Sequence, residues 1–366
     1  MSFKEKIYTI LSLRQFKYLI KNNNELALYI FFSRNKKFKL ILKNEIELDL
    51  GYKDMSALYD FLGVLRFSVK CTQISNTIAQ ISFDFENYID ISLDFSLSKN
   101  KKLLKLLHEG IKYGVTFLTN QQNSLKYEKS LKLDSINGRQ IVITSENLKF
   151  YLDSIEPWIF IETFILKIHE INSSEDFVGK LIVDVGANKG DTPIYYANKG
   201  AIVYAFEPMK FHYDEMIENL SLNPELGKKV IPVHAAIGQN GMMKMYQPID
   251  SDRGDATAFY NLDQNKANIS SVRGYDLRSA CEEYGIKTID LLKMDCKGCE
   301  FLITPEDLVN VKSIKIEYTT FGSHKVEELI KMLADSDFQY IIYLHDPRYV
   351  GSFKNTGHIY AIKKSN

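Results

Sequence analysis

The chain has 366 residues, of which 45% are hydrophobic and 25% are charged, as expected of a globular protein with about two or three domains. Its 46 basic residues balance its 46 acidic residues, which argues against a nucleic-acid-binding protein, because such proteins usually carry a basic surface. Four cysteines are too few for a disulfide framework, and no stretch has the pattern of a signal peptide or of a bilayer-spanning helix, so we expect a cytoplasmic protein with no transmembrane segment.

Residues 1–135 are predicted to form a smaller α+β domain, whose role the sequence leaves open, with substrate recognition as one option. Strands are predicted from apolar or alternating runs over residues 26–32, 38–42, 81–85 and 89–93. Helices are predicted from apolar residues at every third or fourth position over residues 55–65 and 103–113. The polar stretch 121–125 is the candidate boundary of this domain.

Residues 136–178 are predicted to link this domain to the next one. Asn137 and Gly138 are typical turn residues and begin a predicted hairpin over 140–152. A helix is predicted over 156–170, with Pro157 at its first position, where the missing N–H costs no hydrogen bond.

Residues 179–366 alternate between strand and helix patterns, which predicts an α/β domain with a mostly parallel sheet covered on both faces. The predicted strands are 181–185, 202–206, 230–236, 289–294, 314–316, 340–344 and 358–362. The predicted helices are 192–199, with Thr192 as its N-cap, 208–222 and 277–284.

The loop 184–192, between the first strand of this domain and the helix after it, is the strongest candidate for a binding site, because ligands of such sheets bind at the carboxyl ends of the strands. A dinucleotide fingerprint needs glycines at the third and sixth positions from Gly186, but Asn188 and Asp191 stand there. Asp184 and Asp191 would also repel a pyrophosphate. S-adenosylmethionine carries an ammonium and a sulfonium cation and no phosphate, so these acids favour it.

Glu207 follows the second strand, about 20 residues after Asp184. An acid at this place can accept hydrogen bonds from two ribose hydroxyls. Taken alone, Glu207 would be better interpreted as an acid that stabilises the start of the next helix. Together with the loop, the ribose role is the better interpretation.

Residues 290–300 form a second motif, at the end of the fourth strand. Lys293 and Asp295 share one face of the strand, and Asp295 is expected at its tip, beside the transferable methyl group. A lysine within an apolar strand is costly unless it is paired, so we expect Lys293 to pair with an acid of the same motif. Glu300 is expected in the first turn of the following helix.

Cys296 and Cys299 lie in the same motif and raise the possibility of a zinc or redox site. Zinc would need further ligands, and no histidine has a suitable spacing. We therefore expect no metal and interpret the two cysteines as small residues packed under the site.

Glu317 ends the fifth strand and is a candidate base or substrate ligand, with an exposed surface acid as the alternative. His324 and His345 are further candidate bases, although a lone histidine is more often structural.

Taken together, these motifs resemble those of the FkbM family of methyltransferases. The resemblance runs from about residue 179 to 362 and rests on the runs 184–192, 206–208, 235–238 and 290–300. It implies a Rossmann-like class I methyltransferase domain with a seven-stranded sheet, whose last strand is antiparallel, and O-methylation of sugar or polyketide hydroxyls. Lys297 departs from the family pattern, which usually has glutamate there, and this puts a substrate contact in doubt.

The sequence thus predicts an S-adenosylmethionine-dependent O-methyltransferase acting on a sugar, glycan or other small molecule, and leaves its oligomeric state open. The alternatives are a methyltransferase of nucleic acid or protein, and a catalytically silent scaffold of the same fold. The predicted cofactor-binding residues are Asp184, Gly186, Ala187, Asn188, Gly190, Asp191, Thr192, Glu207, Pro208 and Ala236. The predicted catalytic residues are Asp295, Glu317 and Lys293, and Glu300 is the predicted substrate ligand.

Overall fold

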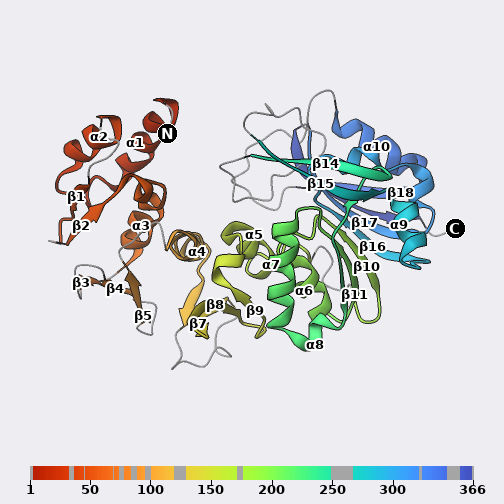
Figure 1. Ribbon diagram of the computed structural model, residues 1–366, viewed down its shortest axis with the longest axis horizontal. Helices are drawn as coiled ribbons and strands as arrows, with labels where there is room; N and C mark the ends of the chain where they lie inside the picture. The colour runs from red at the N-terminus through yellow and green to blue at the C-terminus, as the bar shows by residue number, and fades with distance from the viewer. Residues whose placement is uncertain are drawn as a thin grey trace. The chain divides into compact units, whose positions relative to one another are not determined.

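The computed structural model describes residues 3–32, 37–44, 46–68, 70–73, 78–83, 89–94, 100–118, 129–170, 176–248, 267–320, 324–343 and 355–364. The chain divides into two compact units, Met1–Ile165 and Leu166–Asn366, whose elements are labelled in Figure 1. The segment 136–178 is therefore divided between the two units at Ile165. Among the described residues, no helix is both long and apolar enough to cross a membrane.

The first unit begins with α1 (Phe3–Leu13) and α2 (Asn23–Phe32), followed by the antiparallel pair β1 (Phe38–Ile41) and β2 (Glu47–Leu50). The prediction of a strand over 26–32 is wrong, because this segment lies in α2. Its buried residues, Leu26, Tyr29 and Ile30, are spaced by three and one, which is a helical spacing. The segment 33–36, between α2 and β1, lies outside the described residues.

The predicted helices of the first unit are confirmed as α3 (Met55–Phe67) and α4 (Lys101–Lys112). The antiparallel strands β3 (Lys70–Gln73), β4 (Ile78–Phe83) and β5 (Ile89–Asp94) form one sheet. A second sheet contains β6 (Thr116–Leu118), β7 (Ser130–Ile136), β8 (Arg139–Thr144) and β9 (Lys149–Tyr151). The candidate boundary 121–125 lies outside the described residues.

Helix α5 (Pro157–Phe164) ends the first unit. Pro157 is its first residue, as predicted, but the helix ends at Phe164, so the prediction of a helix through 170 is wrong. Lys167 has a φ of 51°, a left-handed conformation that an α-helix does not continue through.

The second unit is built on a seven-stranded sheet in the order β12-β11-β10-β16-β17-β19-β18. The strands are β10 (Leu181–Val185), β11 (Ile202–Phe206), β12 (Val230–Val233), β16 (Ile289–Met294), β17 (Val311–Thr319), β18 (Phe338–Tyr343) and β19 (Thr356–Lys363). Only β19, the last of the seven in the chain, runs antiparallel to its neighbours. The predicted Rossmann-like α/β fold with an antiparallel last strand is confirmed.

Helices cover both faces of this sheet (Figure 1). They are α6 (Asp191–Asn198), α7 (Lys210–Ser221), the short α8 (Pro224–Gly227), α9 (Leu277–Glu283) and α10 (Val326–Asp335). The apolar residues of α9 and α10 pack with Val183, Leu292 and Ile314 in one core. The predicted N-cap of α6 is wrong by two residues, because Gly190, not Thr192, precedes the first helical residue.

A small three-stranded sheet was not predicted from the sequence. It consists of β13 (Ala236–Ile237), β14 (Gly241–Pro248) and β15 (Ala267–Tyr275), in the order β13-β15-β14. Ala236, Met243, Met245 and Val272 form a small core with Met209. This sheet therefore packs on the segment that follows β11, next to the candidate site.

Candidate active site

The loop from β10 to α6 passes very close to the end of β16. Gly186 has a φ of 83°, and a Cβ built on it would lie 2.2 Å from the carbonyl oxygen of Asp295. The amides of Gly186 and Ala187 both donate to the carbonyl oxygen of Phe206, at 3.0 Å. The loop is thus held between the ends of β11 and β16, and no side chain fits at its first glycine.

Glu207 holds the same loop from the other side. Its Oε2 accepts a hydrogen bond from the amide of Asn188, and its Oε1 accepts one from the amide of Met209, both at 2.8 Å. The carboxylate is only 4% exposed, and Nδ1 of His212 lies 3.7 Å from Oε1. Asn188, whose amide donates to the acid, has a left-handed backbone with a φ of 47°. Glu207 is therefore fixed at the loop before any ligand is considered.

A buried ion pair lies directly beneath the loop. Nζ of Lys293 is 2.9 Å from Oδ1 of Asp184, and both side chains are almost completely buried. The prediction that Lys293 pairs with an acid of its own motif is therefore wrong in its partner, because Asp184 stands beside it on the neighbouring strand. Burial alone would lower the pKa of Lys293, but Asp184 and Asp295 outweigh it and raise that pKa, so the ammonium stays charged. Burial raises the pKa of Asp184, and Lys293 opposes this shift.

The two predicted bases, Asp295 and Glu317, are brought together at the edge of the sheet by Lys297. Its Nζ lies 2.5 Å from Oδ1 of Asp295 and 3.3 Å from Oε1 of Glu317. All three side chains are partly exposed. Burial opposes the charge of Lys297, but the two carboxylates raise its pKa well above its ordinary value. The site edge therefore carries two carboxylates and one ammonium.

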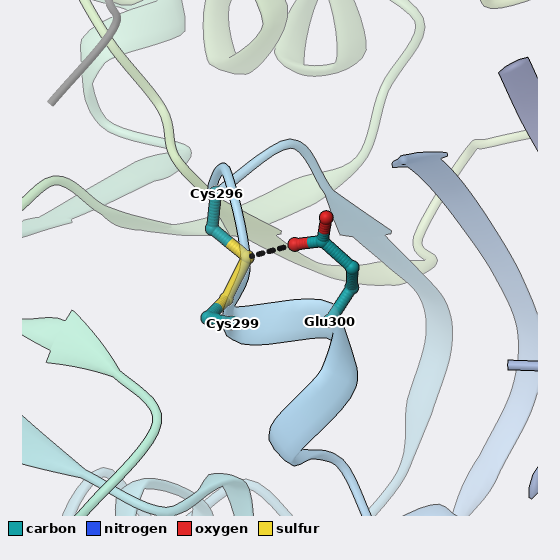
Figure 2. Close-up of side chains that lie close together, drawn as sticks. All are labelled: Cys296, Cys299 and Glu300. Carbon is teal, nitrogen blue, oxygen red and sulfur yellow. Dashed lines mark hydrogen bonds between the residues drawn. A yellow bond between two sulfur atoms is a disulfide. The ribbon is translucent and has the colours of Figure 1, made fainter. Parts of the chain in front are cut away.

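Cys296 and Cys299, which were interpreted as small residues packed under the site with a zinc or redox site as the alternative, are joined by a disulfide (Figure 2). Oε2 of Glu300 lies 3.3 Å from Sγ of Cys296 and accepts a hydrogen bond from the amide of Gly298 at 2.8 Å. Glu300 is only 1% exposed, and its burial raises its pKa to about 7. It lies in the first turn of a short 3-10 helix, Cys299–Leu302, as predicted, and its role as a substrate ligand stays a prediction.

The remaining predicted residues lie at or near the start of α6 and beside β11. Gly190 immediately precedes α6, and Asp191 and Thr192 are its first two residues and are buried. Pro208 follows Glu207, and Ala236 lies in β13. Nδ1 of the partly buried His324 lies 2.9 Å from Oε2 of Glu328, and its ring stacks on that of Phe301, with the ring centroids 4.7 Å apart. His345 lies outside the described residues.

Sequence reasoning missed several polar residues at this edge. Strand pairing places His358 of β19 opposite Glu317 and also opposite Tyr343 of β18. The rings of Tyr343 and His358 are 5.4 Å apart. Burial, together with the charge of Glu317, raises the pKa of Tyr343, so its hydroxyl stays protonated. Only the register of the antiparallel last strand could have placed these residues here, and the sequence does not give that register.

This arrangement suits a cationic ligand. Asp184, Asp191 and Glu207 surround the loop after β10, and Asp295 and Glu317 lie at the neighbouring strand ends. A phosphate at this loop would meet several like charges, whereas a sulfonium or ammonium would meet opposite ones.

Residues 184–340 match the model of the FkbM methyltransferase domain. The chain is 27% identical to methyltransferase sdnD of Sordaria araneosa over 189 residues, which are 43% of this chain and 72% of that protein. It is similar to the crystal structure of Aeropyrum pernix fibrillarin with natively bound S-adenosyl-L-methionine, at 11% identity and a TM-score of 0.36, over 81% of this chain and 99% of that one. It is also similar to magnesium protoporphyrin IX methyltransferase of Synechocystis PCC 6803 with bound SAM, at 13% identity and a TM-score of 0.30, over 54% and 74%. The matched range contains the loop, Glu207 and the three charged residues Asp295, Lys297 and Glu317, which we call the ion triad.

Proposed function

We propose that this chain, whose residues 184–340 match the model of the FkbM methyltransferase domain, transfers a methyl group from S-adenosylmethionine to a hydroxyl oxygen of a sugar, glycan or other small molecule. The main support for the proposal is the carboxylate of Glu207, which accepts hydrogen bonds from two backbone amides and is thereby fixed in position. It lies beside the loop after β10, which has further acidic residues around it. When bound, S-adenosylmethionine would supply an already activated methyl group.

The residues around the loop fit this cofactor. Gly186 has no side chain at the point where the loop comes closest to the end of β16, and a side chain there would clash with the carbonyl oxygen of Asp295. Glu207 stands where it can accept hydrogen bonds from ribose hydroxyls, since carboxylate oxygens can each accept more than one. Asp191 would contribute negative charge that favours the cationic methyl donor, whereas the charge of Asp184 is balanced by Lys293. The cofactor would thus be bound by Gly186, Asn188 and Glu207 and stabilised electrostatically by Asp191, and the ion pair of Asp184 and Lys293 would support the loop from below.

The acceptor hydroxyl must lose its proton as its oxygen attacks. Lys297 contacts Oδ1 of Asp295 and Oε1 of Glu317, and we assign the proton to Oδ2 of Asp295. Lys297 would orient both carboxylates toward the acceptor and keep them from repelling each other. Removal of the proton then needs no residue from outside this edge of the sheet.

The cofactor is tested by titration calorimetry of the purified chain with S-adenosylmethionine and, in parallel, with NAD. We expect heat with the first ligand only. Glu207→Ala should weaken binding by about 1–3 kcal/mol, because a buried charged hydrogen-bond partner is lost. Glu207→Gln, which keeps an acceptor of the same size, should lose less. Binding of NAD in place of S-adenosylmethionine would overturn the proposal.

The reaction is tested by transfer of a radiolabelled methyl group to glycans, small polyols, lipids and nucleic acids in separate assays. Among products methylated on oxygen, a methyl ether survives mild alkali, whereas a methyl ester is cleaved, so this step separates hydroxyl from carboxyl acceptors. Asp295→Asn should lower kcat by about 10²–10⁴-fold if Asp295 is the base. Transfer to nucleic acid alone, or alkali-labile product alone, would contradict hydroxyl methylation of a small molecule.

A further inference from the structure

A disulfide closes the turn that immediately follows the proposed base. Cys296 and Cys299 are three residues apart, with their Cα atoms at 5.5 Å. This Cα separation lies within the usual range for disulfides. Between them lie Lys297, with a φ of 54°, and Gly298, with a φ of 126°. The covalent bond therefore closes a very short ring that contains the lysine of the ion triad.

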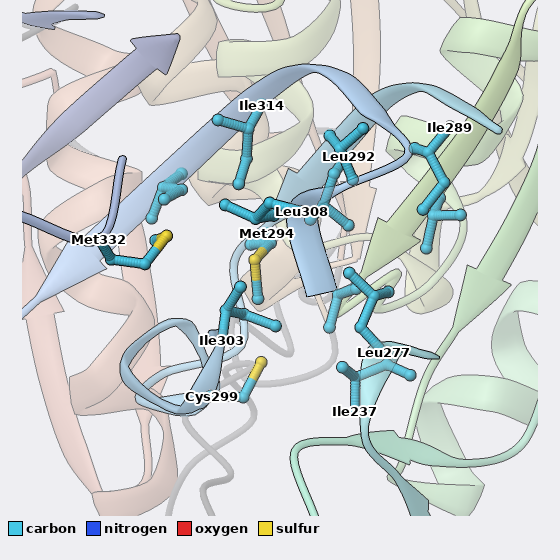
Figure 3. Packing of buried hydrophobic residues seen from close by; sticks show 14 of the residues in the cluster. Ile237, Leu277, Ile289, Leu292, Met294, Cys299, Ile303, Leu308, Ile314 and Met332 are labelled. Carbon is cyan, nitrogen blue, oxygen red and sulfur yellow. The ribbon is translucent and has the colours of Figure 1, made fainter. Parts of the chain in front are cut away.

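The two sulfur atoms differ in their surroundings. Cys299 is 2% exposed and packs in the apolar core of the second unit, among residues such as Ile303 and Met294 (Figure 3). Cys296 is only partly buried, and the carboxylate of Glu300 lies 3.3 Å from its sulfur. A small thiol from solution can thus approach the Cys296 sulfur more easily than the Cys299 sulfur.

The same turn contacts the proposed cofactor loop. A Cβ built on Gly186 would lie 3.5 Å from Cα of Cys296, besides its clash with the carbonyl oxygen of Asp295. The amide of Asp295 also donates to the carbonyl oxygen of Val185 at 3.0 Å. Because backbone touches backbone here, a shift of Cys296 must move the loop or be opposed by it.

We propose that Cys296 and Cys299 form a reversible redox site, whose dithiol and disulfide states set different affinities for the cofactor at the adjoining loop. The redox pair itself stands on the disulfide and the turn geometry, and the effect on affinity rests on the proposed function. The co-reactant is a low-molecular-weight or protein dithiol in the reducing direction and a disulfide in the oxidising direction.

A thiolate of the reductant attacks the Cys296 sulfur, the bond between the two protein sulfurs breaks, and Cys299 leaves as a thiolate that takes up a proton. In the mixed disulfide, the first sulfur of the reductant is bonded to Cys296. The second thiolate of the reductant attacks this first sulfur, and Cys296 leaves as a thiolate and is protonated. Two electrons pass to the protein, and the reductant becomes a cyclic disulfide. The buried carboxyl of Glu300, next to the Cys296 sulfur, can give the proton in this direction and take it in the other.

Reduction has a direct structural consequence for the site. Two thiols cannot stay at bonding distance and must separate to van der Waals contact, which moves Cys296, Cys299 or both. Cys299 is held in the core, so Cys296 moves, and with it the backbone that contacts Gly186 and carries Lys297. We expect the affinity for S-adenosylmethionine to differ between the two states by about 5-fold or more, the lower end of typical allosteric coupling.

The test uses the full chain after exchange into an oxidised or a reduced dithiothreitol buffer. Free thiols are alkylated, and the peptide with Cys296 and Cys299 is followed by mass spectrometry, with Cys71 and Cys281 as free-thiol references in the same chain. We expect this peptide to gain two labels on reduction and to lose them again on reoxidation. Calorimetry with S-adenosylmethionine is then done on both states.

Two variants separate the pair from the other cysteines. Cys296→Ser cannot form the bridge and should bind S-adenosylmethionine equally in both buffers. Cys281→Ser, which changes a partly buried free cysteine, should keep the difference between the buffers. A peptide fully labelled in the oxidised buffer, or equal affinities of the wild-type chain in both buffers, would overturn the proposal. So would one zinc ion bound per reduced chain that blocks reoxidation, since Cys296, Cys299 and Glu300 would then be metal ligands. Absence of heat with S-adenosylmethionine in both states would refute the proposed function and the coupling together, while the label count would still decide the redox pair.

Discussion

At the scale of single residues, the ion pair of Lys293 and Asp184 is the interaction on which the site is built. Both side chains lie in the sheet interior, where an isolated charge is very unfavourable. Lys293→Met should therefore lower the free energy of unfolding by about 3–5 kcal/mol, because it leaves Asp184 buried without its cation. Urea denaturation of the purified variant measures this loss.

The control is the double variant Asp184→Asn with Lys293→Met, which removes both charges. It should be clearly more stable than Lys293→Met alone, because no uncompensated charge stays buried. If the single and double variants unfold at the same urea concentration, the pair contributes through packing and not through charge.

Glu300 gives the stability of the second unit a dependence on pH. Burial raises its pKa to about 7 in the folded chain, from an ordinary value of 4.5. Below the ordinary value the carboxyl is neutral in both states. As the pH rises from there toward 7, the unfolded chain releases this proton first, so the folded state loses stability, by about 3 kcal/mol in total.

Glu300→Gln keeps the shape of the side chain and removes its titration. The variant should therefore lack the part of the pH dependence that Glu300 causes. Unfolding free energies of both chains at about pH 5 and about pH 8, with the disulfide intact, give this difference directly. Equal losses of stability in the wild type and the variant between these pH values would show that Glu300 does not titrate there.

The residues of the site were predictable to very different degrees. Asp295 and Glu317 could be placed at one edge because parallel strands end together, and the pairing of Lys293 with Lys315 does set them side by side. The bridge by Lys297 could not be predicted, because it depends on a left-handed backbone at that residue. The charge reversal that the sequence marked as a departure thus supplies the cation between the two acids.

At the scale of elements, the loop from β10 to α6 depends on a glycine at position 186. Gly186→Ala brings a Cβ to within 2.2 Å of the Asp295 carbonyl oxygen, so the end of β10 or the end of β16 must shift. We expect a loss of about 1–3 kcal/mol in stability beyond the cost of the backbone conformation itself, and a matching loss of cofactor affinity. Thermal unfolding and calorimetry measure both.

Gly285→Ala is the matched control for this change. Gly285 also has a positive φ, 66°, but a Cβ there would meet nothing within 4 Å. It should therefore show only the conformational cost, about 1–2 kcal/mol for a left-handed residue. If Gly186→Ala and Gly285→Ala lose the same amount of stability, the close approach of Gly186 to Asp295 does not contribute to the effect of the substitution.

Element prediction succeeded where apolar periodicity and end signals agree. The helix that begins at Leu277 was found from its pattern, and its start is fixed by Asp276, whose Oδ1 accepts from the amide of Ser279 at 2.7 Å. The prediction of elements failed for α2, because a short apolar run is compatible with either a helix or a strand. There the decision comes from tertiary contacts, since Asn22 at the start of α2 hydrogen-bonds to the backbone of Lys39 and Ile41 in β1.

At the scale of the whole molecule, the parallel core of the sheet followed from the alternation of strands and helices, because crossovers of this kind give adjacent parallel strands. The antiparallel direction of β19 did not follow from any local pattern and came only from the resemblance to a family. The small sheet of β13, β14 and β15 was missed, since its residues between Gly238 and Tyr275 show no regular period. Long-range pairing, which a single sequence does not encode locally, explains these differences.

The division of the chain at Ile165 makes a prediction about the two units. Residues 166–366 contain the whole seven-stranded sheet, its core and every candidate site residue, so this fragment should fold alone and bind S-adenosylmethionine as tightly as the full chain. If the first unit recognises the acceptor, the option that the sequence analysis named, the fragment should lose methyl transfer while it keeps cofactor binding. Circular dichroism, calorimetry and the transfer assay on the fragment and the full chain separate these properties. A fragment that transfers methyl groups at the full rate would remove substrate recognition from the first unit, and one that does not fold would show that residues 1–165 belong to the same cooperative unit.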